Sequence, residues 1–348
     1  MNTAHRPIRL HIDSAALVSN WRWLARMSGS AACGAAIKAD GYGLGAIEVA
    51  KHLAGAGCRD FFVATWAEAE PLLHTLGDAS LSVLHGLAAE DVAIAASSMA
   101  RPVLNTPIQV ARWREAAPGQ PCDVMVDTGM NRLGLGAEDI AGGILDGLDV
   151  HTLMSHLASA DEDVAMNDRQ LDTFRSLSGR VQARRFSLAN SAGICLGEPY
   201  AFDLTRPGLA LYGGIPRPEA EGHLQQVVRL EAQIIQRRRV PAGGTVGYNA
   251  TFAAETATEI ATVNLGYADG YLRGFSGRGR ARIGDSFAPV VGRVSMDLTA
   301  ICVDAAPELG EGDWVEIDFH LPSASAQSGL SQYELLTNLG SRHERRWA

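Results

Sequence analysis

The stretch Ala36-Ile37-Lys38-Ala39-Asp40-Gly41-Tyr42-Gly43 ends a short apolar run with a lysine and a glycine-rich turn. Lys38 is one of two lysines among 30 lysine and arginine residues. A lysine amine can lose its proton and become a nucleophile, whereas an arginine guanidinium stays protonated. Taken alone, Lys38 is more simply explained as a loop lysine of an arginine-rich protein. Its meaning therefore depends on the segments that surround it.

Eight apolar runs of this kind alternate with longer segments of helical period between residues 34 and 210. The runs begin near Gly34, Asp60, Leu81, Arg101, Cys122, Val150, Arg184 and Phe202. The segments between them carry helix signals, such as the capping box that Thr65 forms with Glu68. Strands that each lead into a helix predict an α/β fold with an N-terminal (β/α)8 barrel of the TIM type.

Polar residues stand at the ends of most of these runs. They are Lys38, Asn105, Asp127, His156, Asn190 and Arg206, at the ends of the first, fourth, fifth, sixth, seventh and eighth runs. In a (β/α)8 barrel the carboxyl ends of the strands form one mouth, which holds the active site. Each residue alone is typical of a loop or of a buried polar group. Their convergence on one mouth predicts a functional site there.

The pattern changes after about Gly222, where strand-like segments follow one another without a long helical segment. These segments are residues 227–240, 259–265, 289–294, 299–303 and 314–319. The sequence therefore predicts a barrel domain over residues 1–223 and a smaller, mostly β domain over residues 224–348. Within the second domain, the Ser- and Gln-rich residues 321–331 predict a loop, and residues 333–339 a short helix.

The composition argues against several kinds of partner and site. A net charge of −9 does not suit a nucleic-acid or anionic-membrane partner, because both favour a basic surface. The five cysteines are widely spaced and contain no Cys-x-x-Cys pair, so neither disulfides nor a zinc site are expected. The chain has no run of about 18 apolar residues and no secretion signal. We therefore expect a soluble, cytoplasmic protein.

Several short motifs occur in a fixed order along the chain. In the first domain they are AIKADGYG at 36–43, VDTGMNRLG at 126–134, SHLA at 155–158, ANSA at 189–192 and RPG at 206–208. In the second domain they are VGYNA at 246–250, GYADG at 266–270 and GRVSMD at 292–297. Each motif is a modest signal. Together they resemble the alanine racemase family, within the fold-type III pyridoxal-phosphate-dependent enzymes, over nearly the whole length.

The resemblance implies two catalytic bases on opposite faces of the substrate, Lys38 and Tyr248. Lys38 would carry pyridoxal 5'-phosphate as a Schiff base, which needs a primary amine, and the freed amine would exchange a proton with the substrate Cα. Because a tyrosine titrates near pH 10, Tyr248 needs nearby positive charge or hydrogen bonds to act as a base. Arg132 would supply part of that charge and bind the substrate carboxylate.

The resemblance also implies how the cofactor is held. Arg206 would face the pyridine nitrogen, with His156 hydrogen-bonded to it. Because a guanidinium can only donate, the ring nitrogen would stay unprotonated and transamination would be disfavoured. The other implied cofactor-binding residues are Tyr42, Asn190, Ser191, Gly208, Leu209 and Tyr333. Ser191 and Gly208 follow the seventh and eighth runs, where barrel enzymes often bind phosphate.

In the second domain, Met296 and Asp297 would line the substrate carboxylate, and Tyr267 and Arg273 the entrance. The family places the residues that match Tyr248 and Met296 in the active site of the partner chain. The resemblance therefore implies a homodimer whose active sites are shared between subunits.

One position departs from the family pattern. Met125 stands where family members often have a carbamylated lysine that holds the substrate-binding arginine. The sequence leaves open whether a bound anion, a carboxamide or a carboxylate supports Arg132 instead.

The leading hypothesis is an isomerase that interconverts L- and D-alanine, either supplying D-alanine for peptidoglycan or acting in alanine catabolism. A serine or broad-spectrum racemase and a decarboxylase are alternatives with the same cofactor, although the motifs at 246–250 and 295–297 disfavour the decarboxylase. A non-catalytic cofactor carrier would leave the second domain unexplained. A metal-dependent barrel hydrolase needs clustered ligands, and the runs offer only His156 and His85, so no metal is expected.

Overall fold

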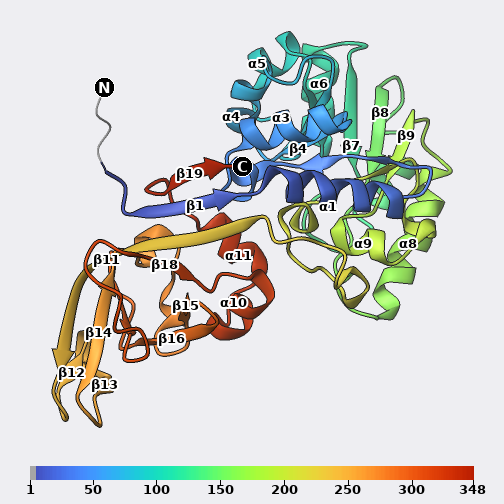
Figure 1. Cartoon of the computed structure of the whole chain (residues 1–348). Coiled ribbons are helices and arrows are strands. Elements are labelled where there is room, and N and C mark those ends of the chain that lie inside the picture. The colour runs from blue at the N-terminus through green and yellow to red at the C-terminus, as the bar shows by residue number, and fades with distance from the viewer. Residues whose placement is uncertain (1–4) are drawn as a thin grey trace. The chain divides into compact units, whose positions relative to one another are not determined.

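The computed structural model describes residues 5–348, which divide into two compact units (Figure 1). One unit comprises residues 17–225, and the other comprises residues 5–16 together with 226–348. The start of the chain joins the second unit because β1 (Ile8–Ile12) pairs with β11 (Val228–Val240) and with β19 (Glu344–Trp347). The sequence prediction had assigned this start to the barrel, because a strand that pairs far along the chain leaves no local signal.

The unit of residues 17–225 is a barrel of parallel strands. The strands are β2 (Ala32–Cys33), β3 (Ala35–Ala36), β4 (Asp60–Val63), β5 (Ser80–Val83), β6 (Arg101–Leu104), β7 (Pro121–Met125), β8 (Asp149–Met154), β9 (Arg185–Ser187) and β10 (Leu204–Thr205). Strands β3 to β9 form one sheet in chain order. The sheet closes through β10, which pairs with β2 and shares backbone hydrogen bonds with the β9 segment. The eight predicted runs and the predicted TIM-type barrel are therefore confirmed.

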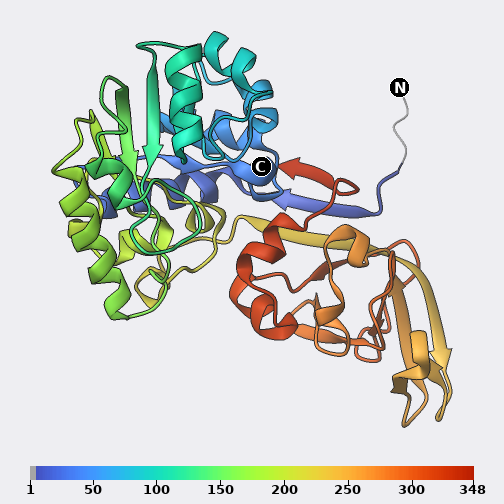
Figure 2. The ribbon, with the colours of Figure 1, turned by 180° about the vertical axis from the view of Figure 1, so that it is seen from behind.

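Helices follow these strands around the barrel (Figures 1 and 2). They are α1 (Ser14–Met27), α2 (Lys38–Tyr42), α3 (Ala46–Ala56), α4 (Trp66–Ala69), α5 (Val92–Ser97), α6 (Pro107–Ala116), α7 (Ala137–Ala141), α8 (Ala165–Ser178) and α9 (Ser191–Cys195). The predicted capping box at the start of α4 is present, since the side chains of Thr65 and Glu68 each accept from the other residue's backbone. No helix among residues 5–348 is long and apolar enough to cross a membrane.

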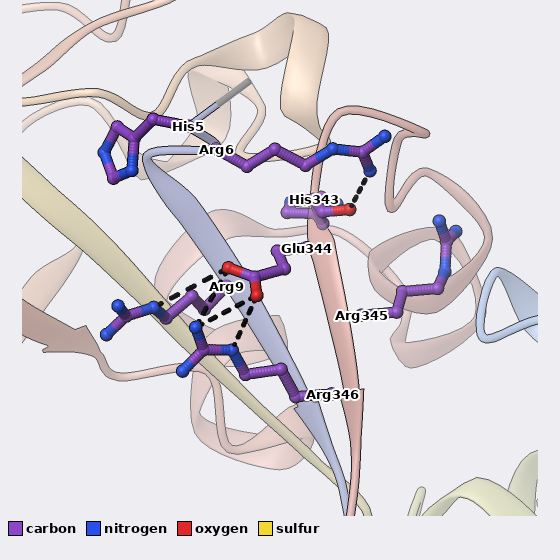
Figure 3. Close-up of a pocket in the computed structure, with 7 residues that line it drawn as sticks. All are labelled: His5, Arg6, Arg9, His343, Glu344, Arg345 and Arg346. Carbon is purple, nitrogen blue, oxygen red and sulfur yellow. Dashed lines mark hydrogen bonds and ion pairs between the residues drawn. The ribbon is translucent and has the colours of Figure 1, made fainter. Parts of the chain in front are cut away.

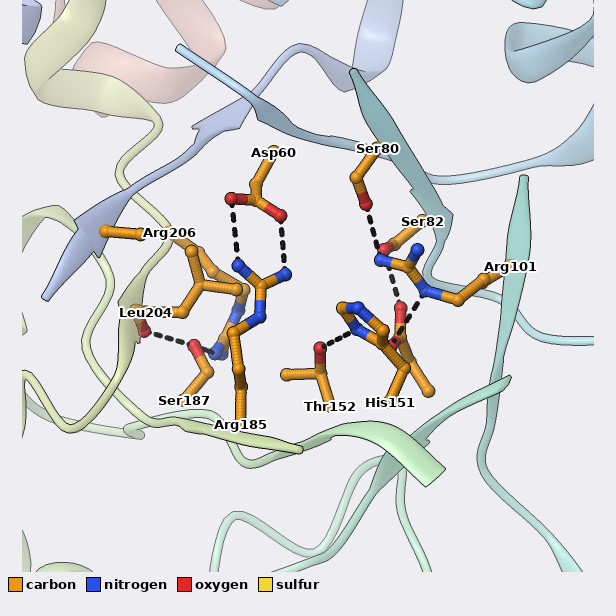
Figure 4. A network of polar contacts seen from close by, with 12 residues as sticks. Asp60, Ser80, Ser82, Arg101, His151, Thr152, Arg185, Ser187, Leu204 and Arg206 are labelled. Carbon is orange, nitrogen blue, oxygen red and sulfur yellow. Dashed lines mark hydrogen bonds and ion pairs between the residues drawn. The ribbon is translucent and has the colours of Figure 1, made fainter. Parts of the chain in front are cut away.

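An ion pair joins two strands that are not neighbours in the barrel, β4 and β9 (Figure 4). Arg185 of β9 donates to both carboxylate oxygens of Asp60 in β4, at 3.0 and 2.5 Å. Barrel interiors are usually filled by branched apolar side chains, so this interior is more polar than usual. The apolar runs of the sequence did not reveal these paired charges.

A second polar group surrounds Asp123 of β7, which is fully buried. Its carboxylate accepts from Ser82 Oγ at 2.6 Å and from Arg101 Nε at 3.2 Å (Figure 4). Burial alone would raise the pKa of Asp123, but the neighbouring His151, Arg101 and Ser82 lower it below its ordinary value. Asp123 is therefore ionised and compensated inside the barrel.

The second unit is built mainly from antiparallel strands. Besides β1, β11 and β19 they are β12 (Thr245–Val246), β13 (Phe252–Ala253), β14 (Thr258–Val263), β15 (Arg280–Ile283), β16 (Ser286–Val291), β17 (Thr299–Cys302) and β18 (Trp314–Ile317). The main sheet has the order β14-β17-β16-β15-β18-β11-β1-β19, and β14 also pairs with β11. The predicted mostly β domain and its five predicted strands are confirmed.

One local prediction in this unit is wrong. Residues 321–331 were expected to form a loop, but α10 (Leu321–Ser328) covers most of them and α11 (Gln332–Thr337) follows. The helix α10 buries Leu321, Ala324 and Ser328, and a proline stands in its first turn. Packing of this short face stabilises a helix that the polar composition does not predict.

Candidate active site

Lys38 follows β3 at the mouth of the barrel and begins an unusual turn. Ala39, Asp40, Gly41 and Tyr42 all have left-handed backbone conformations, with φ between 52° and 63°. A left-handed conformation costs a non-glycine residue roughly 1–2 kcal/mol, so a run of them needs support from its surroundings. Backbone strain of this kind is concentrated at functional sites.

Arg206 follows β10 and is buried in the barrel. Its guanidinium donates to Ser187 Oγ (Figure 4) and to the Ser155 carbonyl. None of the ion pairs within residues 5–348 involves Arg206. Burial lowers the pKa of Arg206 to about 10, and the charge of Asp123 opposes that change. The side chain is a buried cation that is hydrogen-bonded only to uncharged oxygens.

His156, at the end of β8, is surrounded by positive charge. Burial, together with the charges of Arg206, Arg132 and Lys38, lowers the pKa of His156 to about 3. The imidazole is therefore neutral at physiological pH. The predicted hydrogen bond from His156 to Arg206 is absent, because Arg206 donates to two serine oxygens instead.

The amine of Lys38 lies near the same basic side chains. Burial lowers the pKa of Lys38, the charge of Arg132 lowers it further, and the carboxylate of Glu68 opposes both. A lowered pKa leaves more of the amine unprotonated near neutral pH, as a nucleophile or base requires. The structure thus brings together Lys38, His156 and Arg206 from three distant strand ends.

A polar cradle lies where the seventh and eighth strands end. Ser191 Oγ accepts from the backbone amides of Gly208 and Ala210, at 2.9 and 3.2 Å. A Cβ on Gly208 would lie 2.2 Å from the hydroxyl oxygen of Tyr42, so only glycine allows the tyrosine to approach. Leu209 begins the following 3₁₀ turn and is buried. These predicted residues therefore share one place, with a hydroxyl and two amides.

The other strand-end residues have local hydrogen bonds. The Asn190 side chain accepts from the Gly193 amide at 2.9 Å and caps α9. The Asp127 side chain accepts from the Gly129 amide at 2.7 Å, and Asn105 is buried. These contacts account for Asp127 and Asn190 as supports of the loops at the mouth.

The loop that carries Arg132 rests on Met125. A Cβ on Gly134 would lie 3.2 Å from Met125 Cγ, and the Leu135 amide donates to the Met125 carbonyl at 2.9 Å. Arg132 is exposed and has no hydrogen bond or ion pair within residues 5–348. Of the supports that the sequence left open, a carboxamide or carboxylate of the described chain is therefore not in contact with Arg132.

The remaining predicted residues lie in the second unit. Tyr248, between β12 and β13, is 66% exposed, and Met296 is 53% exposed. Asp297 forms an ion pair with Arg342 at 2.7 Å, and Tyr333 is exposed on α11.

Tyr267 and Arg273 lie together in the same unit. The Arg273 guanidinium carbon lies 5.2 Å from the centre of the Tyr267 ring, which is a cation–π distance. The backbone amides of Tyr267 and Ala268 donate to the carbonyls of Ser295 and Met296, each at 3.0 Å. The two predicted entrance residues and the loop of Met296 are therefore neighbours.

The second unit also contains a cavity of about 790 Å³ along β1 and β19 (Figure 3). It is lined by His5, Arg6, Arg9, His343, Glu344, Arg345 and Arg346. Arg346 pairs with Glu344 at 3.0 Å, and Arg6 donates to the His343 carbonyl. The lining includes none of the predicted site residues. The described residues hold no cluster of three or more His, Cys, Asp or Glu side chains that could bind a metal ion.

Both units match the models of one family. Residues 12–216 match the alanine racemase N-terminal domain, and residues 227–347 match the alanine racemase C-terminal domain. The chain belongs to the alanine racemase family. Enzymes of this family are amino-acid racemases, which are isomerases.

Relatives in this family are similar over almost their full length. An alanine racemase of Methylobacterium nodulans is 43% identical, over 99% of this chain and 97% of the relative. A catabolic alanine racemase of Agrobacterium fabrum is 41% identical, over 97% of this chain and 91% of the relative. The crystal structure of a Bartonella henselae alanine racemase with covalently bound pyridoxal phosphate has a TM-score of 0.92 and 34% identity, covering 99% of this chain and all of the other.

Sequence reasoning missed one residue of this site, Glu68. Its sequence context gives it a complete role as the third residue of a capping box, so nothing pointed beyond that role. Its contact with the residue after Lys38 becomes visible only in the folded barrel.

Proposed function

We propose that the chain is a pyridoxal-phosphate-dependent alanine racemase that interconverts L- and D-alanine, with Lys38 and Tyr248 as its two bases. The observation that carries this proposal is the grouping of Lys38, His156 and Arg206 at three strand ends of one barrel mouth. The names of the relatives support alanine as the substrate.

The residues at the mouth fit pyridoxal phosphate. Lys38 offers a primary amine of lowered pKa for the aldehyde, and Arg206 offers a buried donor for the ring nitrogen. Ser191, with the tight approach of Tyr42 to Gly208, offers a cradle for the phosphate. When bound, the cofactor withdraws electrons from the substrate Cα and makes its C–H bond acidic.

Lys38 would take or return the Cα proton on one face of the substrate. Its lowered pKa favours the unprotonated amine that a base requires, and the residue begins the left-handed turn. Tyr248 would serve the other face, with its phenol oxygen as the atom that holds the proton. The family resemblance places Tyr248 and Met296 in the partner's site, so we propose a homodimer with shared active sites.

Arg206 would donate to the ring nitrogen without giving up its proton. The guanidinium keeps its charge even though burial lowers its pKa to about 10. The ring would then store less negative charge, which disfavours protonation away from the substrate Cα and hence transamination. His156, neutral beside these cations, would add no further charge.

Arg132, Met296 and Asp297 would bind the substrate carboxylate, the last two through their backbone. The exposed guanidinium of Arg132 has no protein partner among the described residues and is free to pair with a carboxylate. Tyr267 and Arg273 would line the entrance. The reaction would supply D-alanine for peptidoglycan or act in alanine catabolism, and one relative carries the word catabolic in its name.

The test is to incubate the purified protein, loaded with pyridoxal phosphate, with L-alanine and to separate the products by chiral chromatography. We expect D-alanine to appear with no loss of total alanine, and borohydride to fix the cofactor to Lys38. Lys38→Ala should abolish both results. The matched control is Lys51→Arg, because Lys51 is exposed on α3 and pairs with Glu48 at 2.7 Å. Unchanged D-alanine formation by Lys38→Ala would refute the proposal.

A further inference from the structure

The carboxylate of Glu68 links the ends of two neighbouring barrel strands. One oxygen, Oε1, accepts from the amide of Ala39 at 2.8 Å. The other, Oε2, accepts from the amides of Ala64 and Thr65 at 2.7 and 3.3 Å. A single side chain therefore connects the residue after Lys38 with the segment that follows β4.

The Ala39 amide is the first amide of the left-handed turn, and its bond to Glu68 stabilises the start of that turn. Ala39 and Asp40 have φ values of 53° and 52°, which are unfavourable for residues with a Cβ. Farther along, the Asp40 side chain accepts from the Ala46 amide at 2.9 Å. Glu68 holds the start of the turn, and a bond to a charged acceptor is stronger than one between neutral groups.

The charge of Glu68 also has a place in the site. The groups that act on the pKa of Lys38 are Arg132, which lowers it together with burial, and Glu68, which raises it. His156 lies close enough to feel the charges of Lys38 and Arg206 as well. Among these groups Glu68 is the carboxylate, and the others are cationic or neutral.

We propose that Glu68 positions Lys38. The carboxylate of Glu68 fixes the left-handed turn that follows Lys38, and this turn holds the lysine with its amine at the barrel mouth. The proposal rests on the proposed function only in calling Lys38 catalytic. Its geometric content, that Glu68 orients the lysine, holds for the chain without its cofactor.

A helix cap alone does not account for these contacts. The capping box explains the bonds between Glu68 and Thr65 at the start of α4, which has only four residues. It does not explain the bond from Oε1 to Ala39, which lies 29 residues earlier in the chain. Thr65 therefore offers a matched control, because Thr65→Ala removes the side-chain half of the cap and leaves Oε1 on Ala39.

The first test uses the full-length protein without cofactor. Trace acetylation with acetic anhydride at a series of pH values, read by mass spectrometry, gives the labelling midpoint of Lys38 relative to Lys51. In Glu68→Gln we expect the Lys38 midpoint to move to lower pH, because a negative charge is lost, while Lys51 stays unchanged. Thr65→Ala should leave both midpoints in place. An unchanged Lys38 midpoint in Glu68→Gln would overturn the proposal.

A second measurement uses only the wild-type protein, so it does not depend on whether a variant folds. Hydrogen exchange of the wild-type protein should show slow exchange at the Ala39 amide, although Ala39 itself is exposed. Fast exchange at this amide would mean that the bond to Glu68 is not formed in solution, and would also overturn the proposal.

The loaded enzyme gives a third readout. Misplacing Lys38 should lower kcat/KM of Glu68→Gln roughly tenfold to a hundredfold, with Thr65→Ala close to wild type. If the wild-type protein does not racemise alanine, the proposed function fails. The labelling midpoints and the Ala39 exchange rate then still decide the role of Glu68.

Discussion

Arg206 carries a charge that its surroundings do not neutralise by direct contact. Its acceptors, Ser187 Oγ and the Ser155 carbonyl, are uncharged. A buried charge without an opposite partner destabilises the fold, so such a group is retained for a reason other than stability. In our account the reason is a donor to the cofactor ring that cannot lose its proton.

Replacing Arg206 by lysine tests that reason, because an ammonium keeps the charge but can transfer its proton to the ring nitrogen. We expect Arg206→Lys to lower the racemisation rate roughly a hundredfold and to raise the fraction of turnovers that end in pyruvate. Pyruvate is measured with a coupled lactate dehydrogenase assay, and D-alanine by chiral chromatography. A variant with the wild-type ratio of pyruvate to D-alanine would contradict this role.

His156 gives a prediction about pH. The folded chain holds the pKa of His156 at about 3, below its unfolded value, so the unfolded chain binds more protons between those two values. Stability from this residue is present above about pH 6.5 and is lost, at up to about 1.4 kcal/mol per pH unit, as pH falls towards 3. Urea unfolding at pH 5 and pH 7 should show a smaller loss in His156→Asn than in wild type. Equal losses of unfolding free energy in the two proteins would refute the lowered pKa of His156.

Several residues of the candidate site could be predicted to lie together, because the ends of strands are visible in the sequence pattern. Lys38, His156 and Arg206 each close an apolar run, and the barrel brings such ends together. The sequence did not predict that Arg206 donates to Ser187 rather than to His156. Both residues are within reach of the same mouth, and the sequence does not decide between them. Glu68 stayed hidden because its capping role already explained it.

Among the secondary-structure elements, the barrel strands were predictable and several strands of the second unit were not. The barrel strands are continuous apolar runs, as is usual for strands that are buried on both faces. In contrast, β15 has the sequence RARI and β19 the sequence ERRW. Their charged residues are partly exposed, and neither strand contains an apolar run. Both strands are fixed by the partners they pair with, which the local sequence does not encode.

The link between β4 and β9 gives a prediction about stability. Asp60→Ala removes the partner of Arg185, whose side chain is only 24% exposed. We expect the free energy of unfolding to fall by roughly 2–4 kcal/mol. This loss is smaller than that expected for a fully buried ion pair, because Arg185 is partly solvated. The matched control is Arg184→Ala, because Arg184 pairs with Asp149 at the surface and should cost less than about 1 kcal/mol. Equal losses in urea titrations of the two variants would show that the barrel pair has no special weight.

At the scale of the whole molecule, the proposed bases lie in different units of the chain. Lys38 belongs to the barrel unit and Tyr248 to the β unit, and Tyr248 is largely exposed. The sequence predicted the two domains because the pattern changes from alternating strands and helices to strands alone. It could not place residues 5–16 in the second unit, because pairing with β11 and β19 is set by the whole fold.

Shared active sites predict that two inactive variants restore each other. Lys38→Ala and Tyr248→Phe chains should each be inactive alone. Each mixed dimer should recover up to about half of the activity of a wild-type dimer, because one of its two sites then contains both intact bases. Subunit exchange is confirmed by native mass spectrometry before activity is read. Mixed dimers without activity would mean that Lys38 and Tyr248 of one chain work together.

The two-base mechanism can be tested by following solvent deuterium into alanine with wild-type protein and with Tyr248→Phe. Two opposed bases predict that wild type incorporates deuterium at Cα of both enantiomers while it interconverts them. Tyr248→Phe should keep exchanging the Cα hydrogen of one enantiomer through Lys38, without converting it to the other. Racemisation by Tyr248→Phe at the wild-type rate, or equal exchange of both enantiomers, would contradict the account.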